Sequence, residues 1–215
     1  TKEMQKTMLN NKTSPQSVSP IKAIANQLSE SEKISKIQYH FAEIMDALGL
    51  DLTDDSLKDT PKRVAKMFVK ESFSGLDPKN KPSISLFENK YGYHRMLVEK
   101  DITLYSNCEH HFVPIIGKVH LAYIPGDKVI GLSKINRLVQ YYGKRPQVQE
   151  RLTMQIAEAM REILQHDDVA VVIEADHLCV ASRGIHDTNS MTTTSCYMGQ
   201  FENKALQQEF LTYIK

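Results

Sequence analysis

Residues 112–124, which read FVPIIGKVHLAYI, mark the point where the apolar pattern of the chain changes its period. Large apolar residues alternate there with charged or smaller ones: Val119, Leu121 and Tyr123 against Lys118, His120 and Ala122. Alternation with a period of two is typical of a strand that buries one face. We therefore expect a strand here, paired with another strand over residues 95–105.

The sequence before these strands is helical in pattern. Ser29 with Glu32 fits a capping box, and Gly49 supplies a left-handed end after a run of apolar residues at helical spacing. A second helix is expected with Thr60 as its N-cap and Pro61 at its first position. The remaining expected elements are helices over 133–142, 146–165 and 205–214, and strands over 169–180 and 191–201.

This order of elements predicts an α+β fold, in which N-terminal helices precede an antiparallel sheet with helices packed on one face. We expect three regions along the chain: a flexible arm over 1–28, a helical region over 29–90 and an α+β domain over 91–215. The arm is expected to be flexible because its polar residues cannot bury enough surface to offset the entropy of ordering.

Composition excludes several classes of protein. The chain has 215 residues, with 27 Lys and Arg against 26 Asp and Glu, and the net charge of +1 argues against a protein that coats nucleic acid. No apolar run approaches the ~20 residues that a membrane helix needs, and no secretory signal is evident. Three cysteines do not make a disulfide scaffold, so we expect a reducing cytoplasm, where cysteines more often indicate metal or catalysis.

A metal site is indicated by two separated segments. Cys108 and His111 are three positions apart and can reach one ion if the backbone turns between them. Cys179 follows His177 by two positions, so a strand over 169–180 would place both side chains on one face. Cys108, His111 and Cys179 would then share the ion and leave a fourth position open, as in catalytic zinc sites. His110 and His177 would lie nearby, unbound, as proton carriers.

Other interpretations of these residues remain open at this point. Cys108 and Cys179 could be ordinary buried cysteines, or they could form a disulfide. Cys196 is expected to be a packing residue. His110 could be a fourth ligand, which would make the site structural. The His-Glu-x-x-His pattern of metalloproteases and the zinc-deaminase pattern are both missing from the sequence.

A phosphate site is indicated less directly. Residues 126–134 resemble a P-loop but place Leu132 where the essential lysine belongs, so we reject a P-loop. A helix that begins near Ser133 would still offer free N–H groups to phosphate, and Lys134 and Arg137 would add charge. Arg183 is a further candidate, although such cations are more often solvated.

A base-binding site is indicated at Glu150, in the first turn of the helix after Pro146. A carboxylate can accept two hydrogen bonds from one planar edge, such as N1–H and the amino group of guanine. The helix dipole alone would also favour a glutamate there.

Together these motifs resemble the zinc-dependent type of GTP cyclohydrolase I. The resemblance runs from about residue 30 to the end of the chain and is carried by short segments in the right order. These segments are CEHHF at 108–112, GLSKI at 131–135, QVQERLT at 147–153, HLC at 177–179, DDS at 54–56 and TPKRVAKM at 60–67.

The resemblance implies a tunnelling fold, a ring-shaped homodecamer and active sites between subunits. The implied reaction converts GTP and water to 7,8-dihydroneopterin triphosphate and formate, at the start of pterin and folate biosynthesis. It implies one zinc ion per subunit, and neither a nucleic acid nor a membrane as a partner. Whether the enzyme is allosteric or binds a regulatory protein is left open.

The resemblance also implies roles for single residues. Zinc would bind Cys108, His111 and Cys179, and His177 would donate a proton near the imidazole ring with His110 assisting. The implied catalytic residues also include Ser133, near the ribose, and Gln149, which would hold the guanine edge together with Glu150. The other implied substrate contacts are Leu132 near the nucleoside and Lys134, Arg137, Arg183 and Arg63 at the triphosphate, with Arg63 from a neighbouring subunit.

Two rival functions remain. A pterin or deazapurine enzyme on the same fold would use Glu150 without needing zinc. A zinc-stabilised assembly module would close the metal site with four ligands and have no use for His177. Metal analysis and a test for formate release from GTP would separate these alternatives.

Overall fold

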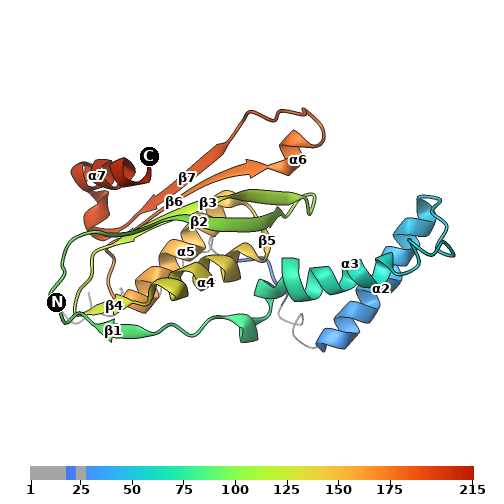
Figure 1. Cartoon of the computed structure of the whole chain (residues 1–215), viewed down its shortest axis with the longest axis horizontal. Coiled ribbons are helices and arrows are strands. Elements are labelled where there is room, and N and C mark those ends of the chain that lie inside the picture. Colours follow the sequence, from blue (N-terminus) through green and yellow to red (C-terminus); the bar gives the residue numbers. More distant parts are fainter. Residues whose placement is uncertain (1–17, 23–27) are drawn as a thin grey trace.

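The computed structural model of the chain describes residues 18–22 and 28–215, so most of the predicted arm over 1–28 lies outside the described residues. A five-stranded sheet forms the body, and two helices extend beyond one end of it (Figure 1). None of the helices in the described ranges is both long and apolar enough to cross a membrane.

The main sheet has the order β5-β2-β3-β6-β7. Its long strands are antiparallel neighbours, as predicted: β2 (Leu97–Cys108), β3 (Pro114–Tyr123), β6 (Val169–His177) and β7 (Thr192–Tyr197). The short β5 (Pro146–Gln147) pairs in parallel with the end of β2, which makes the sheet mixed. A second, two-stranded sheet joins β1 (Leu86–Glu88) to β4 (Lys128–Ile130).

Two helices cover one face of the main sheet, α4 (Leu132–Gly143) and α5 (Gln149–Leu164). The alternating residues Val119, Leu121 and Tyr123 are fully buried in the core on this side. This agrees with the predicted strand and with an α+β architecture of the tunnelling type.

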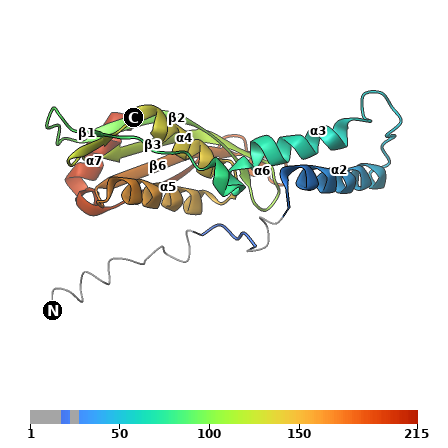
Figure 2. The ribbon, with the colours of Figure 1, turned by 90° about the horizontal axis from the view of Figure 1, so that it is seen from below.

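The prediction that helices lie on one face only is wrong at one end of the sheet. There η5 (Gly199–Glu202) and α7 (Lys204–Ile214) cover the opposite face (Figures 1 and 2). Their Phe201 and Phe210 pack against a patch of small or branched strand residues: Ala122, Ala170 and Val172. His120 is buried beside this patch, so alternation on β3 did not indicate an exposed face.

The predicted strand over 169–180 is wrong in its last residues. β6 ends at His177, and Cys179 lies instead in the one-turn helix α6 (Leu178–Ala181). His177 is the last residue of β6 paired with β3, opposite Ile115. The next position on β3 is Pro114, which has no N–H to donate, so the ladder stops there.

The two N-terminal helices, α2 (Glu30–Ala47) and α3 (Thr60–Met67), pack against each other as a hairpin and lie alongside each other in Figure 2. The predicted capping box is confirmed, since Ser29 Oγ accepts from the N–H of Glu32 and the Glu32 carboxylate accepts from the N–H of Ser29. Gly49 adopts the expected left-handed conformation, with φ of 78°. The N-cap of α3 is Asp59 rather than Thr60, which is already helical.

After α3 the chain continues through three short helical turns, η2 (Phe68–Ser72), η3 (Ser74–Leu76) and η4 (Pro78–Asn80). Gly75 in η3 is buried against the end of α4, and its N–H donates to the carbonyl oxygen of Lys144 at 2.9 Å. A Cβ atom at Gly75 would lie 2.0 Å from the carbonyl oxygen of Tyr141. Only glycine fits this contact, which joins the helical hairpin to the body.

Candidate metal and nucleotide site

The turn after β2 brings Cys108 and His111 together. The N–H of Cys108 donates to Val113, the N–H of Phe112 donates back to the carbonyl of Cys108 at 2.8 Å, and Phe112 has a left-handed φ of 54°. Nδ1 of His111 lies 4.0 Å from Sγ of Cys108, and Nδ1 of His110 lies 3.6 Å from the same sulfur. The turn that this spacing requires for a shared ion is therefore present.

Cys179 reaches the same place from α6. One ligand atom each of Cys108, His111 and Cys179 lies within 4.8 Å of the others, and no other group of this kind is found among the described residues. Burial raises the pKa of the Cys179 thiol, and the neighbouring Cys108 thiol raises it further. Two sulfurs and an imidazole are donors that suit zinc, and the short distances fit one shared ion.

The metal turn is anchored by an ion pair that sequence reasoning missed. Arg151 of α5 donates to the carboxylate of Glu109 and to Oε1 of Gln147, and both side chains of the ion pair are largely buried. The N–H of Glu109 also donates to the carbonyl of Gln147 at 3.0 Å. One signal for this pair was available in the sequence: Glu109 in the segment 108–112 and Arg151 in the segment 147–153 carry opposite charges.

His177 stands at the end of β6 and is half-buried beside α5. Its Nε2 lies 2.8 Å from Oε1 of Gln149. Burial lowers the pKa of His177 below 6.5, while the carboxylates of Glu150 and Asp176 act in the opposite direction. His177 therefore lies next to the uncharged side chain of Gln149 and is influenced by the negative charge of Glu150.

Arg183 follows α6 and contacts the metal group directly. Its Nη1 lies 3.2 Å from Nε2 of His111. One end of the molecule thus gathers a metal group, two further histidines, a cation and the exposed carboxylate of Glu150.

The other predicted contacts are not gathered there. Near the start of α4, Asn136 bonds to Glu99 at the beginning of β2, whereas Cys108 stands at its far end. Glu99 and Cys108 are nine positions apart on β2, which corresponds to roughly 25–30 Å. The start of α4, which carries Leu132, Ser133 and Lys134, therefore lies at the opposite end of the sheet from the metal group of the same chain (Figure 1).

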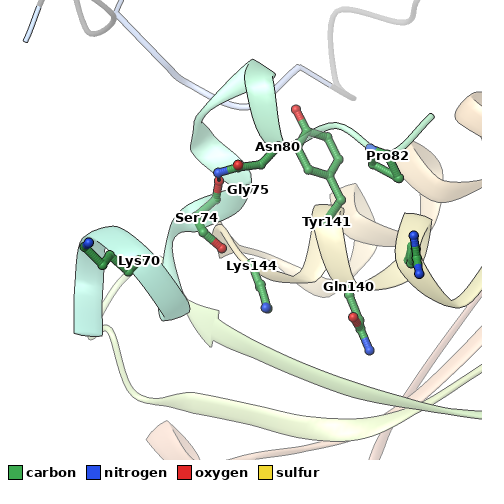
Figure 3. A pocket seen from close by; sticks show the side chains of 9 residues that line it. Lys70, Ser74, Gly75, Asn80, Pro82, Gln140, Tyr141 and Lys144 are labelled. Atoms are coloured by element: carbon green, nitrogen blue, oxygen red, sulfur yellow. Dashed lines mark hydrogen bonds between the residues drawn. The ribbon is translucent and has the colours of Figure 1, made fainter. Parts of the chain in front are cut away.

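The two remaining cations line separate cavities. Arg63 lies with Lys62 and Lys66 along a cavity of about 240 Å³ on α3. Arg137 lies with Lys70 and Lys144 along another of about 390 Å³, between α4 and the turns η2 to η4 (Figure 3). Neither cavity includes a residue of the metal group.

A model of the family described as GTP cyclohydrolase I matches residues 37–215, which is most of the chain. The chain belongs to the GTP cyclohydrolase I family. A GTP cyclohydrolase 1 from Flavobacterium johnsoniae is 57% identical over 196 residues, covering 91% of this chain and 88% of the relative. Relatives of the same name from Vibrio vulnificus and Tolumonas auensis are each 54% identical, over 87% of this chain and 87% of their own length.

Membership of the GTP cyclohydrolase I family confirms the resemblance drawn from the motifs. It makes the chain a hydrolase of the first step in pterin and folate biosynthesis, with GTP as the substrate of its family. The rival interpretation as a non-enzymatic assembly module is thereby excluded.

Proposed function

We propose that this chain opens the imidazole ring of GTP with the help of one zinc ion per subunit, releasing formate and forming 7,8-dihydroneopterin triphosphate. The convergence of Cys108, His111 and Cys179 beside His177 is the observation that carries the proposal. Three protein ligands leave one position of a tetrahedral ion for water. When bound there, zinc would supply Lewis-acid activation of water near neutral pH.

The two remaining histidines would manage protons. Carbon 8 of guanine is a poor electrophile until N7 is protonated, so a proton donor is needed there. His177 is half-buried and oriented by Gln149, which suits this role, and exposed His110 would assist. The pKa of His177 is lowered by burial, which makes its protonated form a stronger acid.

Glu150 would hold the guanine edge. Its side chain is exposed, and its charge acts on His177, so it lies at the same end of the molecule. A carboxylate accepts from N1–H and the amino group of guanine, whereas adenine offers no such pair of donors. This would orient the imidazole part of the base toward the metal group.

A second chain would complete the site. Ser133 and Lys134 are roughly 25–30 Å from the metal group of their own chain, a distance that one nucleotide cannot span. A neighbouring chain in a ring would bring Leu132 and Ser133 to the nucleoside and Lys134 and Arg137 to the triphosphate. Arg63 would also come from a neighbouring subunit, and Arg183 from the chain that holds the metal. We propose the homodecamer that the family resemblance implies, in a reducing cytoplasm that keeps the thiols available.

An assay of GTP conversion tests this proposal. Purified protein is expected to contain about one zinc ion per chain and to release formate from GTP as pterin absorbance develops. A chelator should abolish both signals, and zinc should restore them. Pterin formation that is unaffected by complete metal removal would contradict the proposal, and GTP turnover without formate would favour a related pterin or deazapurine chemistry.

A further inference from the structure

The side chain of Gln149 is more completely bonded than its predicted contact with guanine would allow. The residue is 2% exposed at the start of α5. Its Nε2 donates to the carbonyl oxygens of Ile173 and Thr192, at 3.1 and 2.9 Å, and to Oγ1 of Thr194 at 3.1 Å. Both amide hydrogens are therefore used within the chain.

These partners fix which way the amide points. The two carbonyl oxygens, of Ile173 and Thr192, can only accept hydrogen bonds, so the nitrogen of the Gln149 amide must face them. The amide oxygen then faces His177, whose Nε2 lies 2.8 Å away. A flipped amide would place three oxygens against one another and is excluded on this ground.

A closed circle of hydroxyl groups strengthens this orientation. The hydroxyl of Thr153 donates to the backbone carbonyl of Gln149 at 2.8 Å, so its single hydrogen is used. Thr194, 2.7 Å from Thr153, must then donate to it, and its own oxygen accepts from the Gln149 amide. Every hydroxyl hydrogen in the circle is assigned, and no alternative direction is available.

The fixed amide in turn decides the tautomer of His177. The oxygen of Gln149 can only accept, so Nε2 of His177 must carry a hydrogen and donate it. The ring of His177 is therefore held at Nε2 by this hydrogen bond. Ring orientation and proton position are both set by a neutral partner.

We infer that Gln149 is a positioning residue, whose amide oxygen fixes the orientation of the His177 ring through Nε2, and that its side chain does not itself bind guanine. The inference rests on the proposed role of His177. It leaves recognition of the base to Glu150, whose side chain is exposed. Gln149 is thus assigned to turnover and Glu150 to substrate choice, although they are neighbours in the sequence.

The test compares Gln149→Met with Gln149→Glu in the zinc-loaded enzyme. Methionine fills the space but offers no acceptor, so kcat should fall about tenfold or more. The KM for GTP and the preference for GTP over inosine triphosphate, which lacks the amino group, should change less than about twofold. Protonated glutamate keeps an acceptor for Nε2 of His177 and an O–H donor toward the carbonyls of Ile173 and Thr192, so it should recover part of the lost kcat.

Three results would overturn the inference: a raised KM or lost GTP preference with normal kcat, no change at all, or no recovery by glutamate. Where Gln149→Met does not assemble, Gln149→Glu decides alone: an altered kcat with unchanged KM supports the inference, and any other pattern opposes it. His177→Ala separates the two proposals. Full turnover by that variant would refute the proposed role of His177. If His177→Ala is inactive while Gln149→Met turns over normally, only the positioning role of Gln149 is refuted.

Discussion

Nη1 of Arg183 lies 3.2 Å from Nε2 of His111, so a candidate phosphate ligand contacts a candidate metal ligand. A guanidinium can only donate, and Nε2 must therefore present its lone pair to Arg183. Zinc on Nε2 would displace the guanidinium. Zinc on Nδ1 would leave Nε2 carrying a hydrogen, and Nε2 could then no longer accept a hydrogen bond from Arg183. Metal binding is thus expected to release Arg183 toward the substrate.

Arg183→Ala is expected to bind zinc at least as tightly as the parent chain, with a gain of up to roughly fivefold for one lost hydrogen bond. The KM for GTP should rise because a phosphate contact is removed. Competition with a coloured chelator measures zinc affinity, and steady-state kinetics measures KM. Arg183→Lys, which keeps the charge, serves as the control. Weakened zinc binding in Arg183→Ala would show that the guanidinium supports the metal site instead.

Cys108→Ala and Cys179→Ala are expected to lose zinc and GTP turnover together, because each removes one of three converging ligands. Cys196→Ala is the matched control. Cys196 is buried in the core and is not part of the converging metal group, and burial raises the pKa of its thiol to about 11. Metal analysis and the pterin assay should be run on the same preparations. A cysteine variant that kept zinc at full occupancy would remove that residue from the ligand set.

Glu150→Ala is expected to lower the preference for GTP over ATP by about 100-fold or more, since the base edge loses two charge-assisted hydrogen bonds. The exposed Glu162, near the other end of α5, provides a control that removes the same charge. Competition between GTP and ATP for turnover measures the effect. Equal discrimination by the Glu150 and Glu162 variants would assign guanine recognition to another residue.

Gly75→Ala should destabilise the join between the helical hairpin and the body. The new Cβ atom would meet two backbone carbonyl oxygens, of Tyr141 at 2.0 Å and of Lys144 at 2.7 Å, which cannot rotate away. A loss of about 2–3 kcal/mol in the free energy of unfolding is expected, or roughly 5–10 °C in melting temperature. Gly126→Ala is the control, because its Cβ would meet only His166 at 3.9 Å. Equal melting temperatures for both variants would contradict this packing.

The free energy of unfolding should decrease in mildly acidic solution because of His120. Burial lowers the pKa of His120 below 6.5, against the opposing effects of Asp101 and Glu174, with Lys118 assisting burial. The folded state therefore binds the proton less readily than the unfolded chain. The stability contribution is complete above pH 6.5 or so and is lost as pH falls through the lowered pKa.

His120→Asn keeps an acceptor for the N–H of Asp101 but cannot titrate. Its melting temperature should decline less between pH 7.5 and pH 5.5 than that of the parent chain, as thermal unfolding across this range will measure. The hydrogen bond from Lys118 lowers the pKa of Asp101, so this neighbouring carboxylate stays charged over the interval. A variant with the same pH slope as the parent would assign the effect to other groups.

Local patterns predicted most of the fold because each depends on a few neighbouring residues. The capping box at Ser29, the antiparallel strands and the C-terminal helix are of this kind. The errors arose where distant residues decide. Pro114 ends the ladder that His177 would otherwise continue, and Phe201 with Phe210 covers a face that alternation alone marked as exposed.

The sequence indicated Cys108, His111 and Cys179 as one metal group on the assumption that Cys179 lies in a strand. Cys179 is on a helical turn rather than a strand, yet it still reaches Cys108 and His111. The contacts of Gln149 could not be predicted, because its partners on β6 and β7 are fixed only by the register of the sheet. For the pair of Arg151 and Glu109, opposite charge was the one signal in the sequence.

The separation between the start of α4 and the metal group has a genetic consequence. Two inactive variants, one defective at Cys108 and the other at Lys134, should complement each other when mixed chains are unfolded and reassembled together. A site that takes its metal half from one chain and its α4 half from the neighbour would be intact in about a quarter of random pairings. Dominance and rescue among alleles of this gene would then depend on which end of the sheet each mutation affects.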